Sequence, residues 1–465
     1  MQQEQPLLVL KPLEAFIITF IILGGISYAI IFAGVVPHIP IVLAIMCLFA
    51  YGLVKKVSVK DLEEGLTDGA KSGLGAVFIF FFIGMLISSW MVSGTIPTFI
   101  YMALEVVNGK FFYAIAFFVT AIIGMSIGSS LTTAATIGIA FMSVCTALGL
   151  SEAITAGAVV SGAFFGDKMS PLSDTTNLAS MIVNVDLFDH IKNMTWTTGP
   201  AFVISLIIFG ILSPGEASSN FTKIVFLKNT LNELGYVHWL SLIPFLILTY
   251  LAIKKVSAII TLSAGILSAL LISFFLQKGF SVEKMMSLLF FGFKSDSGVE
   301  EVDSLLSRGG MESMMFPIGI VLLALSMGGL FFRLGILPAL LDGIKEFLHK
   351  VPALIASTAG TAIGINFLLG EQYLSILLTG SAFQESYDRA GLHQKNLSRV
   401  LEDAGTVINP LVPWSVCGVF LTGVLGVATI DYLPFTFFCL LSPLITIVYG
   451  ITGFTISKKD EKAAA

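Results

Sequence analysis

Long apolar segments recur along the chain, and they constrain its fold more than any other feature. Leu13–Val36, Ser72–Ser93 and Met311–Leu334 are three of them, and a helix needs about 20 apolar residues to cross a bilayer. Only 12% of the 465 residues are charged, while 56% are hydrophobic. So little charge excludes a set of soluble domains, and so much hydrophobicity excludes a disordered chain. We expect an all-α polytopic membrane protein.

Several classes of protein are excluded by the charged and metal-binding residue types. The net charge of −5 argues against a partner nucleic acid, which normally requires a basic face. The five histidines and four cysteines are scattered, without the spacing of a metal site or a resident cofactor. We find no Ser-His or HExxH arrangement in the sequence that would indicate an enzyme. The first apolar segment is longer than the core of a signal peptide, so we expect it to remain as a helix.

Short similarities relate the two halves of the chain. Residues 94–97 (GTIP) match residues 335–338 (GILP), and Pro171-Leu172 matches Pro410-Leu411, at separations of 239 to 241 residues. Further pairs at similar separations indicate an internal repeat, although two apolar regions could also align by composition alone. We expect five regions: a helix pair in 1–60, a first repeat in 61–212, a middle helix pair and loop in 213–280, a second repeat in 281–456 and a charged tail in 457–465.

Lysines in short loops predict how the chain lies in the membrane. Lys55, Lys56, Lys60 and Lys71 can share one side with the tail lysines, and the positive-inside rule makes that side cytoplasmic. Both termini would then be cytoplasmic, and the protein would lie in the inner membrane of a bacterium. The first repeat would start inside and the second outside. Such inverted-topology repeats are typical of secondary transporters.

The strongest local signal is the polar stretch 166–177, GDKMSPLSDTTN, which lies between apolar segments. Pro171 is expected to break a helix there, and a broken helix at membrane depth is tolerated where it lines a cavity. The hard oxygen atoms that follow suit Na⁺ better than a soft metal. We expect them to line an ion site, with Asp174 and Asn177 as the main Na⁺ ligands. These candidates are Ser173, Asp174, Thr175, Thr176 and Asn177.

Two carboxyl groups in this stretch are candidates for handling protons and cations. An acid near the bilayer centre costs about 2.5–3.5 kcal/mol, so Asp167 and Asp174 are expected to have a task. One carboxylate can hold a proton or Na⁺ but not both, and this competition is the basis of antiport. The alternative is that Lys168 neutralises one of these acids in a structural pair.

A second set of breaks belongs to the second half. Asn409-Pro410 to Ser415 carries two prolines, with Glu402 and Asp403 one to two turns upstream. Asn409 and Ser415 offer neutral oxygens, although Asn409 could instead cap a helix. The stretch 364–373 matches 124–133, where small residues could instead serve close helix packing. In 364–373 we select Glu371 as a third acid. Its neighbours Asn366 and Gln372 are expected to line the same site.

The stretch 166–177 resembles the signature of the NhaC family of bacterial Na⁺/H⁺ antiporters, and residues 409–414 (NPLVPW) are similar to that family's second-half motif. The resemblance covers roughly residues 13–455. It implies inverted repeats, paired re-entrant hairpins and an elevator-like moving domain. The family contains simple Na⁺/H⁺ antiporters and a malate–H⁺/Na⁺–lactate antiporter, and related members move amino acids or other organic anions.

We therefore expect a secondary antiporter that exchanges Na⁺ for H⁺ across the lipid bilayer, either alone or with a small organic anion. The sequence is also compatible with a homodimer. Three other classes remain as alternatives: a Na⁺-coupled symporter for amino acids or carboxylates, a channel and an intramembrane enzyme. A repeat within one chain argues against a channel, whose filter is usually built by several subunits.

Overall fold

The computed structural model describes residues 6–106, 111–214, 221–254, 256–277, 281–299, 302–303, 306–344 and 350–459. Within these ranges the regular secondary structure is helical, and an isolated bridge between Leu392 and Lys458 is the one β pairing. Most of the predicted charged tail, from residue 460 onward, lies outside the described residues.

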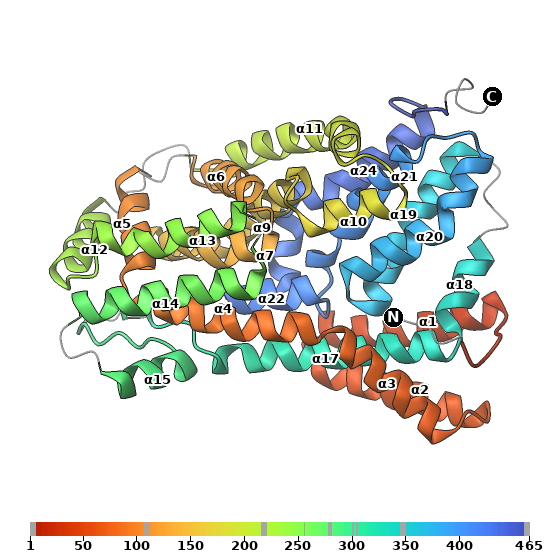
Figure 1. The fold of residues 1–465 in the computed structure, drawn as a ribbon, viewed down its shortest axis with the longest axis horizontal. Helices are drawn as coiled ribbons and strands as arrows, with labels where there is room; N and C mark the ends of the chain where they lie inside the picture. The colour runs from red at the N-terminus through yellow and green to blue at the C-terminus, as the bar shows by residue number, and fades with distance from the viewer. Residues whose placement is uncertain are drawn as a thin grey trace.

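The first half of the chain begins with a helix pair and continues with helices that are interrupted by short breaks (Figure 1). These elements are α1 (Pro12–Ile31), α2 (His38–Val54), α3 (Val59–Ser72), α4 (Leu74–Val92), α5 (Thr95–Val106), α6 (Phe112–Ile127), α7 (Ser130–Thr133), the π-helix η1 (Ala134–Gly138), α8 (Ile139–Leu148), α9 (Glu152–Met169), α10 (Asp174–Ile182) and α11 (Leu187–Leu212).

A middle group leads to the second half. It comprises α12 (Phe221–Glu233), η2 (Trp239–Leu242), α13 (Ile243–Ile253), α14 (Ala258–Leu276) and α15 (Val282–Phe291). The second half comprises η3 (Glu312–Met314), α17 (Met315–Arg333), α18 (Ile336–Ile344), α19 (Val351–Leu369), α20 (Gln372–Arg389), α21 (Lys395–Val400), the π-helix η5 (Leu401–Thr406), η6 (Asn409–Leu411), α22 (Val416–Leu425), α23 (Thr429–Tyr432), η7 (Leu433–Phe435) and α24 (Phe437–Thr452).

Many of these helices are suited to a bilayer. In the described residues seven are long and apolar enough to cross a membrane, or up to nine if each bent pair is one span. One bent pair joins Lys395–Leu411 to Val416–Leu425 at 47°, and the other joins Thr429–Phe435 to Phe437–Thr452 at 59°. The prediction of an all-α polytopic membrane protein is confirmed.

The two halves use the same turns at corresponding places. Gly128 is the C-cap of α6 and Gly370 is the C-cap of α19, both in the left-handed region with φ of +71° and +66°. The next residue caps the following helix in each half, Ser129 for α7 and Glu371 for α20. The two glycines are 242 residues apart, and so are the two capping residues. Ser173 and Ser415, which cap α10 and α22, are separated by the same number of residues. The halves therefore share an element order, and their opposite orientation in a membrane stays a prediction.

Each left-handed glycine lies against the break of its own half. A Cβ on Gly128 would lie 2.7 Å from the Leu172 Cβ, and a Cβ on Gly370 would lie 3.3 Å from the Trp414 carbonyl oxygen. The separation of 242 residues differs from the 239 by which the prolines match. The sequence match paired prolines, whereas the structure pairs the residues that start α10 and α22.

The close approach of Gly128 to the first break yields a test. Gly128→Ala should lower stability more than Gly149→Ala, because Gly149 has a similar φ of +66° but nothing within 4 Å of an added Cβ. Both variants carry the left-handed cost of about 1–2 kcal/mol, and only the first also displaces Leu172. The measurement is the midpoint of thermal unfolding in detergent. Equal losses would contradict the packing of Gly128 against the break.

Candidate functional site

The functional region lies where the breaks of the two halves meet. α7 and η1 pack against α22, and α10 packs against α20, so helices that start at these breaks are neighbours near the centre of the molecule (Figure 1). Each start is capped by a side chain: Ser129, Ser173 and Ser415 use hydroxyls, and Glu371 uses its carboxylate. Helix starts carry partial positive charge, so the region favours nearby carboxylates.

Asp167 is a buried carboxylate at the end of α9. Its side chain is 5% exposed and accepts a hydrogen bond of 3.2 Å from the Ser130 backbone N–H, at the start of α7. The hydroxyls of Ser130 and Ser173 also face this carboxyl. In the described part of the chain no lysine, arginine or histidine forms an ion pair with it. The protein thus supplies hydrogen bonds to Asp167 but no counter-charge.

Lys168 pairs with an acid of the second half. Its ammonium forms an ion pair with Asp403 in η5, and both side chains are fully buried. Lys168 also donates to the Ser442 hydroxyl at 2.9 Å. The alternative that Lys168 neutralises an acid of its own stretch is therefore not what the structure shows.

Asp403 is fully satisfied by the helices around it. Besides Lys168, it accepts hydrogen bonds from the hydroxyls of Thr197, at 3.2 Å, and Ser442, at 2.7 Å. The Thr446 hydroxyl donates to its other oxygen. Asp403 thereby joins η5 to α9, α11 and α24.

The remaining candidates of the first break mostly hold the break together. The Thr176 hydroxyl donates to the Lys168 carbonyl at 3.1 Å. The Asn177 amide donates to the carbonyls of Pro171 and Ser173, at 3.1 and 2.6 Å. The hydroxyls of Thr175 and Ser173 lie 3.0 Å apart. These contacts fix the loop between α9 and α10 and shape what faces Asp167.

Asp174 and Glu371 occupy the starts of two different helices. Asp174 is exposed and is the first residue of α10. Glu371 is partly buried and accepts a hydrogen bond of 2.8 Å from the Leu374 N–H. Asp167, Asp174 and Glu371 all lie within electrostatic reach of the Tyr373 hydroxyl. The three predicted acids therefore lie around one tyrosine, Tyr373.

Asn366 and Asn409 contact each other in the second half. The Asn409 amide donates to the Asn366 side-chain oxygen at 2.8 Å, and Asn409 accepts the Cys417 N–H at 3.0 Å. Asn366 donates to the carbonyl of Gly405 at 2.7 Å. Asn409 thus accepts a backbone N–H from the first turn of α22, although it is not the N-cap residue of that helix.

Ser415 and Gln372 flank these asparagines. The Ser415 hydroxyl donates to the Asn409 carbonyl at 2.5 Å and caps α22. Gln372 is 6% exposed, and its side-chain oxygen has no hydrogen-bond partner among the described residues. Gln372 thus retains an oxygen that could face a ligand, whereas Ser415 mainly supports the turn.

Sequence reasoning left the centre of this network off its candidate list. Asp403 and Glu402 were noticed only as acids upstream of Asn409, and Thr197, Ser442 and Thr446 carried no signal in any motif. A signal for Asp403 did exist, because a lysine within a membrane segment requires a counter-charge. Its partner could not be chosen from the sequence, since the two residues are 235 positions apart.

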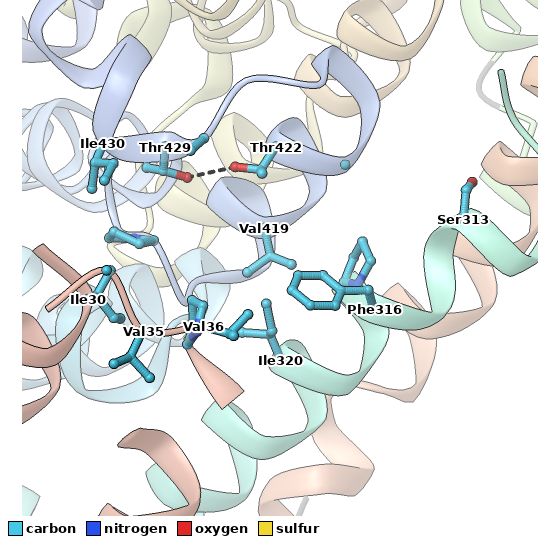
Figure 2. A pocket seen from close by; sticks show the side chains of 16 residues that line it. Ile30, Val35, Val36, Ser313, Phe316, Ile320, Val419, Thr422, Thr429 and Ile430 are labelled. Carbon is cyan, nitrogen blue, oxygen red and sulfur yellow. Dashed lines mark hydrogen bonds between the residues drawn. The ribbon is translucent and has the colours of Figure 1, made fainter. Parts of the chain in front are cut away.

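A cavity of about 460 Å³ lies beside the second break, and it does not contain the acids (Figure 2). Its walls come from the connection between α1 and α2, from α17 and from the region of α22 and α23. The lining is largely apolar, and its polar members include Thr422 and Thr429, whose hydroxyls lie 3.0 Å apart. The lining contains no carboxylate, so none of the predicted acids faces this cavity.

Comparisons with known proteins agree with this arrangement. Residues 162–454, which include both breaks, match the Na⁺/H⁺ antiporter family. The chain is 42% identical to the Na⁺/H⁺ antiporter NhaC of Alkalihalophilus pseudofirmus, over 95% of this chain and 97% of that protein. It is 40% identical to NhaC of Bacillus subtilis, over 89% and 92%. It is also 34% identical to the malate-2H⁺/Na⁺-lactate antiporter of Bacillus subtilis, over 85% of each chain.

The buried ion pair yields a prediction about stability. Asp403→Asn should destabilise the protein strongly, by about 3–5 kcal/mol, because it leaves Lys168 charged and buried. Lys168→Met should cost less, since three hydroxyls would still donate to Asp403. The double variant should recover part of the loss. Thermal unfolding in detergent measures all three, and strictly additive losses would show that the two charges do not depend on each other.

Proposed function

The chain belongs to the Na⁺/H⁺ antiporter family, and from this premise we propose that it is a secondary transporter that exchanges Na⁺ for H⁺ across a bacterial inner membrane. The observation that supports this most directly is Asp167, a buried carboxylate that has no counter-charge among the described residues. A carboxylate in the membrane interior is costly unless a cation accompanies it. Because Lys168 is held by Asp403, Asp167 is free to take H⁺ or Na⁺.

The surroundings of Asp167 suit both cations. The Ser173 and Ser130 hydroxyls face the carboxyl and provide the oxygen ligands that a hard cation prefers. Asp174 extends the site outward: a charged and exposed side chain in a membrane protein faces water rather than lipid. We assign Asp174 to the water-facing entrance of the Asp167 site. We assign Glu371, which caps α20, to the part of the site that the second half contributes.

The same charges explain why exchange would be obligatory. With a proton or Na⁺ on Asp167, this carboxyl is neutral and the loaded site can change the side to which it opens. The empty site carries a negative charge, whose passage through the membrane interior is penalised. Asp167 therefore changes sides readily only when a cation is bound to it. This requirement produces alternating access in which one cation replaces the other.

An organic anion as additional cargo is the second candidate. It draws support from the similarity to the malate-2H⁺/Na⁺-lactate antiporter. A carboxylate cargo would call for a basic group, yet the two arginines that are buried in the described part of the chain are used elsewhere. Arg333 contacts Asp61 and Glu64 at 3.4 and 3.1 Å, and Arg399 contacts Thr455. We therefore favour the simple exchange of Na⁺ for H⁺.

We also propose that both termini face the cytoplasm, as the loop lysines indicate. Accessibility of single cysteines placed at either end of the chain to a membrane-impermeant thiol reagent, in right-side-out and inverted vesicles, tests this orientation.

The central prediction concerns Asp167→Asn in proteoliposomes that contain a pH dye. The wild-type protein should produce a Na⁺-driven pH change without any organic solute. Asp167→Asn should reduce it to the level of empty liposomes, because the neutral amide cannot exchange H⁺ for Na⁺. Asp174→Asn should reduce the flux in part and raise the Na⁺ concentration required for half-maximal flux.

The matched control is Asp431→Asn, which changes an exposed acid in α23 and should leave the flux unchanged. Transport by Asp167→Asn at the wild-type rate would refute the assignment of Asp167. A pH change that appears only after L-malate, L-lactate or an amino acid is added would favour the organic-anion antiporter instead.

A further inference from the structure

Glu402 is a buried acid that has no role in the exchange described so far. Its side chain is fully buried, and neither carboxyl oxygen has a hydrogen-bond partner among the described residues. Buried polar side chains are usually hydrogen-bonded, so such a group requires an explanation. The adjacent Asp403 shows the contrast, since it is equally buried and accepts bonds from Lys168 and three hydroxyls.

The backbone around Glu402 is satisfied, which isolates the side chain as the unexplained group. η5 is a π-helix, a rare conformation that is often found at functional sites. The Glu402 carbonyl accepts the Val407 N–H at 3.4 Å, and the Gly405 carbonyl accepts the Asn366 amide. The buried hydroxyl of Thr406, one turn further on, faces the Glu402 carboxyl, but the two groups do not have the geometry of a hydrogen bond.

The charges around Glu402 come from both halves of the protein. Lys168, Asp167 and Asp403 lie within its electrostatic reach. Lys168 is bonded to Asp403 and Ser442, and together with Asp403 it forms a neutral pair. The helices packed against η5 are α10, α19, α20, α21 and α24. Apart from the exposed groups at the far end of α20, their titratable side chains are Asp174, Tyr373, Tyr387, Lys395, Arg399, Cys439 and Tyr449. Around the neutral pair, Asp167 and Glu402 are therefore two carboxyls that have no cationic partner among the described residues.

We propose that Glu402 is a second proton-binding site of the transporter, so that two protons are exchanged for each Na⁺. This inference rests on the proposed Na⁺/H⁺ exchange. In the proton-loaded state both Asp167 and Glu402 are neutral acids. When Na⁺ binds at Asp167, both O–H bonds release their protons to the water on the open side. With Na⁺ bound, the pair carries one net negative charge instead of none, and without any cation it carries two. The empty pair is therefore still the state whose passage is penalised most, and each cycle moves one charge across the membrane.

The experiment compares wild-type protein, Glu402→Gln and Glu402→Asp in proteoliposomes. Potassium and valinomycin set the membrane potential, and the Na⁺ gradient at which net H⁺ flux stops is measured. For the wild type, a potential of about 59 mV should shift this gradient about tenfold, as expected for one net charge. Glu402→Gln keeps the shape of the neutral acid but binds no proton, so the shift should vanish. Glu402→Asp should retain it.

The control is Glu385→Gln, which changes an exposed acid on α20 whose side chain is 80% exposed, and it should behave as the wild type. A wild-type shift in Glu402→Gln would overturn the proposal. The ratio of H⁺ to ²²Na⁺ moved by the wild type tests it without any variant: a ratio of two supports it, and a ratio of one overturns it. Absence of any Na⁺-driven H⁺ flux in the wild type would refute the proposed function instead.

Discussion

The ion pair between Lys168 and Asp403 is the interaction on which the rest of the site depends. It is fully buried and joins the first break to the π-helix of the second half, while Ser442, Thr197 and Thr446 complete the shell of Asp403. A lone charge at this depth would be strongly destabilising, and each partner makes the other tolerable. By holding Lys168, Asp403 also leaves Asp167 beside it without a counter-charge.

A distinction between satisfied and unsatisfied polar groups then separates structure from function. Thr176, Asn177, Asn366 and Asn409 direct their amides or hydroxyls at backbone carbonyls and at one another, and they keep the broken helices in shape. The carboxyls that remain without a cationic partner or a full hydrogen-bond shell are where exchangeable ions are expected to bind. Because the hydrogen-bonded residues around the site are fixed in place, the net charge of the site depends on whether a small cation is bound.

The two halves show how far motif similarity reaches. Matching short motifs located the breaks of both halves, because prolines and glycines have local conformational requirements that a sequence displays. The motif match aligned Pro171 with Pro410, which shifts the second break by three residues relative to the first, because these prolines do not occupy equivalent positions. Ser173 and Ser415 do, because each starts a helix. Residues of the two halves correspond when they occupy the same place at the start or end of a helix, and the position of a helix end depends on packing as well as on residue type.

The sequence by itself determined the membrane class, the breaks at 166–177 and 409–415, and Asp167, Asp174 and Glu371 as the acids to explain. These conclusions depend on local composition, and the cost of a charge in lipid makes each acid conspicuous. Only the tertiary structure decided that Lys168 pairs with Asp403 and that Glu402 is buried without a hydrogen-bond partner among the described residues. The physical reason is that neutralisation and burial belong to pairs of residues, and these pairs form between helices that are distant in the chain.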